Sequence, residues 1–257
     1  GFAAAGVGMF FGLLTFISGR KLLMGKGETA VPEILEKRLF GIKNEWLIYL
    51  LSASSALIFW QMVQRHEVVS YSLMFAGAVS FIYIVYYAIT QLDKKAREQL
   101  IALTILIVFT IIFWALFEQA YTSLNLFADR ILDRTVLGYT ITASQFLSFN
   151  ALFIILLAPV FAWLWVKLGK YNPNTAVKFS IALLLVGLGF GSLVLGISLS
   201  GMGKVAMIWL ILTYLLHTCG ELCLSPVGLS AVTKLSPAKI VGFMMGVWFL
   251  ATASSEF

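Results

Sequence analysis

The stretch "FSIALLLVGLGFGSLVLGISL", residues 179–199, contains no charged residue and decides the class of fold. A helix of roughly 20 predominantly apolar residues is long enough to cross the hydrocarbon core of a bilayer. Further apolar runs cover residues 1–18, 45–63, 71–91, 99–128, 144–166, 207–235 and 240–257. The sequence therefore predicts an all-α polytopic membrane protein.

The composition supports this prediction and fixes an orientation. Only 12% of the 257 residues are charged, against about 25% in a soluble protein. The connecting segments 19–44, 92–98, 167–178 and 233–239 hold 14 of the 18 lysines and arginines. Because cytoplasmic loops carry an excess of Lys and Arg, we place these segments in the cytoplasm. The net charge of +6 thus reflects topology, and we expect a lipid bilayer and no nucleic acid as partner.

The sequence gives no support for an enzyme. It contains no nucleophile with a matching base, no phosphate-binding glycine loop and no cluster with metal-ligand spacing. Cys219 and Cys223 form a lone pair, which suffices for neither a metal cage nor a disulfide framework. We therefore expect the protein to bind and move a polar solute without a metal.

Two carboxylates lie deep in apolar sequence, Glu118 and Glu221, and a third, Glu256, lies near the end of the chain. A charge at the centre of a membrane helix costs about 2.5–3.5 kcal/mol on insertion scales, and such residues usually face a cavity or a partner. The two buried positions are thus candidates for a proton or solute pathway. A structural salt bridge is the alternative.

Around Glu118, the spacing of Trp114, Phe117, Tyr121 and Asn125 places all five residues on one face of a continuous helix. An acid flanked by aromatic rings, with an amide and a hydroxyl group nearby, suits a cavity for a polar ligand. An aromatic packing face with one satisfied acid is the alternative.

Around Glu221, the residues His217, Ser225 and Gly228 recur at spacings of three and four on one helical face. Pro226 removes a backbone donor and crowds the preceding turn, so we expect a kink and a hinge at this position. His217 could share a proton with Glu221, or it could be a hydrogen-bonded structural residue.

Three further features of the apolar spans point to binding or packing. Asn150 is an amide deep in the span 144–166, where it serves as a ligand contact or an interhelical hydrogen bond. Trp248 lies about nine residues into its span, too deep for the interfacial aromatic belt. Glycines four residues apart predict close helix packing. These pairs are Gly8 with Gly12, Gly187 with Gly191, and Gly242 with Gly246.

Three stretches together resemble the proton-dependent oligopeptide transporters, the peptide branch of the major facilitator superfamily. They are "FWALFEQAYTSLNLFADR" (113–130), "SQFLSFNALFIILLAPVFAWLW" (144–165) and "ELCLSPVGLSAVTKLSPAKIVGFMMGVWFLATA" (221–253). The third is the most specific, and the resemblance covers essentially the whole chain.

The resemblance implies an arrangement of the chain within the family fold. Residues 1–18 would be the end of helix 6, 19–44 a cytoplasmic linker, and 45–98 two extra membrane helices. Residues 99–257 would form the C-terminal bundle, with helices 7 to 10 and a shortened helix 11. We expect a fragment whose N-terminal bundle belongs to the same protein, located in the cell (inner) membrane.

The resemblance also implies roles for single residues. Glu118 matches the helix 7 acid associated with proton coupling and with a salt bridge to helix 1. Glu221 matches the helix 10 acid, which faces the amino terminus of the peptide, and Asn150 matches a helix 8 asparagine near the same end. The matches to residues lining side-chain pockets or constrictions are Trp114, Phe117, Ser225 and Trp248.

The function implied is proton-coupled symport of di- and tripeptides by alternating access, with protons as the coupling ion and no other cofactor. Two alternatives remain: a related carrier for nitrate or another small solute, and a non-transporting membrane receptor or scaffold. An acid at position 221 favours peptides, because nitrate has no ammonium group for it to bind.

Overall fold

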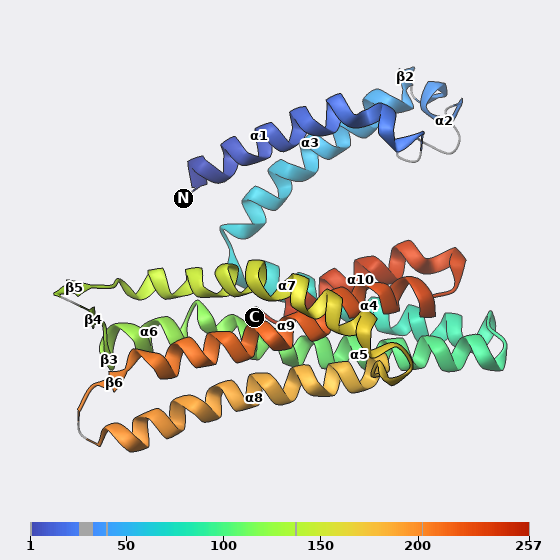
Figure 1. The fold of residues 1–257 in the computed structure, drawn as a ribbon. Helices are drawn as coiled ribbons and strands as arrows, with labels where there is room; N and C mark the ends of the chain where they lie inside the picture. The colour runs from blue at the N-terminus through green and yellow to red at the C-terminus, as the bar shows by residue number, and fades with distance from the viewer. Residues whose placement is uncertain (1, 26–32, 40, 137, 202, 257) are drawn as a thin grey trace. The chain divides into compact units, whose positions relative to one another are not determined.

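The computed structural model describes residues 2–25, 33–39, 41–136, 138–201 and 203–256, and it divides into two units, residues 1–66 and 67–257 (Figure 1). Part of the expected linker, residues 26–32 and 40, lies outside the described residues. The elements of the first unit are α1 (Phe2–Gly19), η1 (Arg20–Leu23), α2 (Glu33–Glu36), β1 (Arg38–Leu39), β2 (Ile42–Lys43) and α3 (Asn44–Val63).

The two long helices of the first unit expose apolar side chains along their length. Phe10 on α1 is 58% exposed and Trp60 on α3 is 61% exposed. Such surfaces are normal against lipid or another protein. α1 covers the predicted span 1–18, whereas α3 mixes its apolar residues with serines and a glutamine. α3 is not among the six described helices that are long and apolar enough to cross a membrane, so the span 45–63 stays a prediction.

The second unit is a bundle of long helices joined by short turns. Its helices are α4 (His66–Thr90), α5 (Lys94–Phe117), η2 (Glu118–Ala120), α6 (Ser123–Arg130), η3 (Ala143–Leu147), α7 (Ser148–Leu168), η4 (Gly169–Tyr171), α8 (Thr175–Ser200), α9 (Met207–Leu235), η5 (Ala238–Ile240) and α10 (Val241–Ser254). Its strands are β3 (Leu132–Asp133), β4 (Thr135–Val136), β5 (Tyr139–Thr140) and β6 (Val205–Ala206).

The starts of two long helices are set by side-chain caps. The carboxylate of Asp93 accepts a hydrogen bond from the backbone N–H of Ala96 at 3.3 Å where α5 begins. The amide oxygen of Asn174 accepts one from Val177 at 2.9 Å where α8 begins. Asp and Asn at these positions satisfy backbone donors that a helix start leaves free.

The described helices confirm a multi-pass membrane protein. Six regions are long and apolar enough to cross a bilayer: Ala5–Leu23, His66–Thr90, Lys94–Arg130, Ala143–Tyr171, Thr175–Ser200 and Met207–Leu235. α10 is shorter and covers most of the predicted span 240–257.

Glycines bring α8 and α9 close together, but they are not the glycines that the spacing predicted. A Cβ atom built on Gly189 would lie 2.5 Å from the His217 ring, and one on Gly196 would lie 2.5 Å from the Trp209 ring. A Cβ atom on Gly220 would lie 3.0 Å from the backbone oxygen of Ala182. The paired glycines Gly8, Gly12, Gly187, Gly191, Gly242 and Gly246 have no such neighbour within 4 Å. The prediction that these paired glycines mark close helix packing is therefore wrong for contacts within this chain. A spacing of four residues does not specify which face of a helix meets its neighbour.

The helix that carries Glu118 is interrupted at that residue. α5 ends at Phe117, a 3-10 turn follows, and α6 begins at Ser123. The side chain of Gln119 stabilises the turn, because its Oε1 accepts hydrogen bonds from Ser123 Oγ at 2.6 Å and Thr122 Oγ1 at 3.3 Å. The helix is therefore interrupted within residues 114–125, and the shared face of the five side chains stays a prediction.

A short parallel ladder joins the end of α6 to the start of α9. Leu132 pairs with Val205 and Asp133 with Ala206, and the N–H of Val205 donates to the carbonyl of Ile131 at 3.0 Å. This ladder of two-residue strands connects the segment after α6 to the start of α9, the helix that carries Glu221.

Candidate functional site

A hydrogen-bonded group links α7 to α9 at the predicted site. Asn150 Nδ2 donates to Glu221 Oε2 and to Thr218 Oγ1, each at 3.0 Å. Asn150 and Glu221 are half-buried, whereas Thr218 is fully buried. Of the two readings of Asn150, the interhelical hydrogen bond is thus present, and one of its partners is the predicted acid.

Thr218 is a member of this group that the sequence analysis missed. It lies three residues before Glu221 and therefore on the same side of α9. Its hydroxyl also donates to the carbonyl of Tyr214 at 2.7 Å. A polar residue at helical spacing from an intramembrane acid was the signal that could have identified it.

Glu118 is half-buried and lies in the 3-10 turn that follows α5. It interacts electrostatically with Glu221 on α9 and with Glu256, which follows α10. Among the described residues, no lysine, arginine or histidine forms a salt bridge with these three carboxylates; a salt bridge elsewhere joins Arg134 to Asp129 at 2.9 Å. The salt bridge expected for Glu118 therefore stays a prediction.

An aromatic cluster adjoins Glu118. The rings of Trp114 and Phe117 meet edge to face with centroids 5.2 Å apart, and Phe117 stacks on Phe113 at 5.7 Å. Phe117 is 7% exposed, and the indole N–H of Trp114 is buried with no acceptor among the described residues. The aromatic packing that the sequence analysis offered as an alternative is therefore present beside the acid.

His217 belongs to this aromatic cluster and not to the hydrogen-bonded group. Its ring lies 6.0 Å from that of Phe117 and 5.0 Å from that of Phe190, and it fills the space left by Gly189. No hydrogen bond between His217 and Glu221 occurs among the described residues. Both ring nitrogens of His217 are buried without a hydrogen-bond partner among the described residues, so the structure shows an aromatic packing role for this ring and neither proton sharing nor the expected structural hydrogen bond.

Trp248 is 4% exposed and packs within the second unit. Its six-membered ring lies on Gly228 of α9, where a Cβ atom would come within 2.0 Å of it, and its indole lies 6.4 Å from the ring of Phe179 on α8. This position agrees with a Trp too deep for the interfacial belt. Its contact with substrate stays a prediction.

Ser225 and Pro226 lie one turn beyond Glu221 on α9. Ser225 is half-buried and Pro226 is exposed, and the helix continues through both to Leu235. The hinge at Pro226 and the substrate contact of Ser225 therefore stay predictions.

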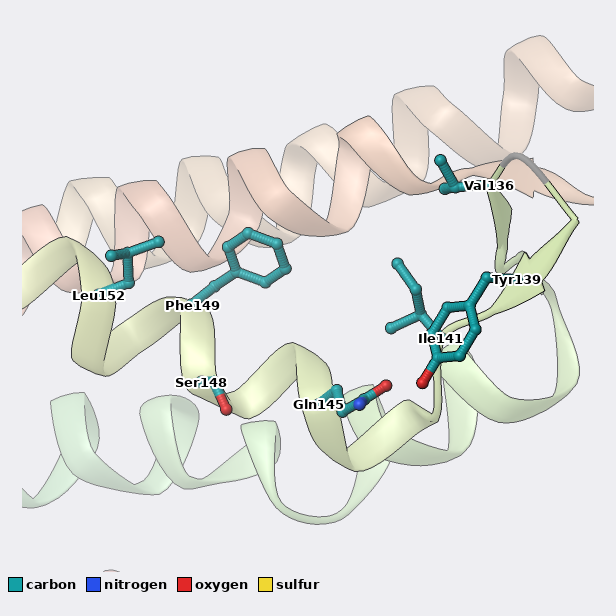
Figure 2. Close-up of a pocket in the computed structure, with 7 residues that line it drawn as sticks. All are labelled: Val136, Tyr139, Ile141, Gln145, Ser148, Phe149 and Leu152. Atoms are coloured by element: carbon teal, nitrogen blue, oxygen red, sulfur yellow. The ribbon is translucent and has the colours of Figure 1, made fainter.

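An open groove of about 710 Å³ lies between the β4–β5 hairpin and the start of α7. Figure 2 shows Tyr139 and Ile141 on one side of the groove and Phe149 and Leu152 of α7 on another. None of the predicted site residues lines it. The groove and the Asn150–Glu221 group are thus separate features of the unit.

Comparison with known proteins matches the POT family model over residues 1–257. The chain is 36% identical over its whole length to an uncharacterized transporter of Bacillus subtilis, covering 52% of that protein. It is 33% identical over its whole length to a di-/tripeptide transporter of Lactococcus lactis subsp. cremoris, covering 54% of that protein. The chain thus spans about half the length of these relatives.

The fold is similar to that of a crystallised POT peptide transporter in complex with alafosfalin. The TM-score is 0.74 at 38% sequence identity, over 99% of this chain and 52% of the other.

Proposed function

Since the chain belongs to the POT family, we propose that its protein is a proton-coupled symporter that imports di- and tripeptides by alternating access. The name of the Lactococcus lactis relative and the alafosfalin complex of the solved relative support a peptide-like substrate. In this proposal residues 99–257 form the C-terminal bundle, residues 45–98 the two extra helices, and the N-terminal bundle is the partner across the substrate cavity.

The observation that carries the proposal is the bond between Asn150 and Glu221. It holds a carboxylate at a fixed position inside a membrane helix, where an unpaired charge is costly. The ammonium group of a peptide is a cation that this carboxylate can bind.

We assign roles in substrate binding and helix bending to the other predicted site residues near this contact. Trp114, Phe117, Ser225 and Trp248 would line pockets for peptide side chains, and Pro226 would let α9 bend. Small and aromatic surfaces tolerate side chains of different size, which suits a carrier of many peptides.

Glu118 is the residue we assign to proton coupling, together with Glu221. It lies at an interruption of its helix, and carboxylates inside membranes are common members of proton relays. Movement of α6 relative to α5 would change the surroundings of the carboxylate and with them its proton occupancy. A membrane potential contributes about 2.3 kcal/mol per proton per 100 mV, which drives appreciable accumulation.

The test uses the full-length protein in liposomes with a pH-sensitive dye inside. We expect inward proton flux to rise when alanyl-alanine is added outside, and not when nitrate is added. A flux that responds to nitrate alone would favour the small-solute carrier. A protein that binds alanyl-alanine without any change in flux would be a receptor, and the transport proposal would be wrong.

A further inference from the structure

We infer that Thr218 is a positioning residue that fixes the orientation of the Asn150 amide, and so determines which acceptors meet the ammonium group of a peptide. This inference rests on the proposed function. Thr218 is fully buried on α9 and holds no assigned role. Its hydroxyl contacts two groups, the carbonyl of Tyr214 and the amide of Asn150.

The direction of these bonds follows from the chemistry of the groups. A carbonyl accepts but cannot donate, so the single hydroxyl proton of Thr218 goes to Tyr214 at 2.7 Å. The oxygen of Thr218 is then an acceptor, and the partner it faces must be the NH₂ end of Asn150 at 3.0 Å. With the amide reversed, two oxygen acceptors would face each other.

Thr218 and Glu221 together occupy both N–H bonds of Asn150. The amide group is planar, so its Oδ1 lies away from these two partners. Among the described residues, neither Asn150 Oδ1 nor Glu221 Oε1 accepts a hydrogen bond, which leaves two acceptors for a ligand. An ammonium group carries three N–H donors and fits such a pair of acceptors.

The hydrogen bond from Asn150 to Thr218 matters most when a peptide ammonium group binds, because it then keeps the amide in its orientation. An ammonium group bound at Oε1 of Glu221 draws charge from the same carboxylate that accepts from Asn150 at Oε2, so the bond from the amide becomes weaker. Thr218 holds the other bond, which does not involve the ligand. Without Thr218 the amide could rotate and offer its NH₂ end to an ammonium group that needs an acceptor.

Thr213 provides a matched control on the same helix. It is also fully buried, and its hydroxyl donates to the carbonyl four residues earlier, at 2.8 Å to Trp209. Its other contacts, Ser192 Oγ and the carbonyl of Gly189, lie on α8. Thr213→Val therefore removes a comparable hydroxyl without touching Asn150.

The experiment measures dissociation constants by calorimetry on the purified full-length protein, with alanyl-alanine and with propionyl-alanine, which lacks the ammonium group. Since a net hydrogen bond is worth about 1 kcal/mol, we expect Thr218→Val to weaken alanyl-alanine binding by about 5-fold and propionyl-alanine binding by less than about 2-fold. Thr218→Ser, which keeps the hydroxyl, should restore binding. Thr213→Val should affect both ligands equally.

Equal losses for both ligands in Thr218→Val, or no loss for either, would overturn the inference. So would a Thr218→Ser variant as weak as Thr218→Val, because the methyl group would then be responsible. If the native protein itself bound propionyl-alanine as tightly as alanyl-alanine, the proposed ammonium contact would be wrong. The result for the native protein therefore separates the failure of the proposed function from the failure of the role of Thr218.

Discussion

Asn150 on α7 and Glu221 on α9 are joined by a hydrogen bond of 3.0 Å although 71 positions separate them in the chain. The bond connects two helices of one bundle and fixes an acid that would otherwise be costly inside a membrane. Changes at either end should therefore alter both ligand binding and the contact between the helices.

Glu221→Gln should weaken binding of alanyl-alanine by about 10- to 100-fold, because hydrogen bonds to charged groups contribute about 1.5–3 kcal/mol. The amide can still meet Asn150, so the fold should survive. Dissociation constants for alanyl-alanine and N-acetyl-alanyl-alanine test this. Acetylation should weaken binding to the native protein far more than binding to the variant. The exposed Glu256 supplies the control variant Glu256→Gln.

Glu118→Gln should abolish accumulation of alanyl-alanine driven by a pH gradient, because the amide cannot exchange a proton. Exchange of labelled for unlabelled dipeptide without a gradient should continue, since exchange needs no net proton movement. Both rates are measured in liposomes. Glu98→Gln, an exposed position near the start of α5, is the matched control. Gradient-driven accumulation by the Glu118 variant would remove that residue from the coupling mechanism.

Gly189→Ala should destabilise the protein by about 1–3 kcal/mol, the usual cost of overpacking. The new methyl group would lie 2.5 Å from the His217 ring, which Phe117 and Phe190 hold in place. Thermal unfolding in detergent measures the effect.

Gly187→Ala is the matched control, because no atom lies within 4 Å of the added methyl group. Combining Gly189→Ala with His217→Ala should cost less than the sum of the two single changes, since the small side chain removes the clash. Additive losses would show that the two residues do not constrain each other.

Arg134→Ala should loosen the segment 131–142 without lowering the unfolding temperature. Arg134 pairs with Asp129 at 2.9 Å and donates to the carbonyl of Ile141 at 3.3 Å. Partly exposed salt bridges contribute about 0–1 kcal/mol, so we expect amide hydrogen exchange in this segment to accelerate by a few-fold. Arg130→Ala, an exposed neighbour at the end of α6, should leave exchange unchanged.

The apolar spans could be predicted because a membrane demands a continuous apolar run. The predicted span 71–91 ends one residue beyond α4, 179–199 falls within α8, and 207–235 coincides with α9. Isolated polar residues were also visible: Asn150 and Glu221 stood out against apolar neighbours, and the structure brings them together.

The features that escaped prediction depend on which faces meet in three dimensions. The interruption after Phe117 is accompanied by hydrogen bonds to the side chain of Gln119, and no Gly or Pro marks it in the sequence. Spacing identified pairs of glycines but not Gly189, whose importance comes from a ring on another helix. The partners of Asn150 were likewise set by the rotation of α7, which the sequence does not specify.

The contact between Gly228 and Trp248 limits the motions available to the last helix. Because the Trp248 indole occupies the space that a side chain at position 228 would fill, a rotation of α10 that drives the ring toward α9 meets the backbone of that helix. The contact thus restricts rotation of α10 about its own axis toward α9.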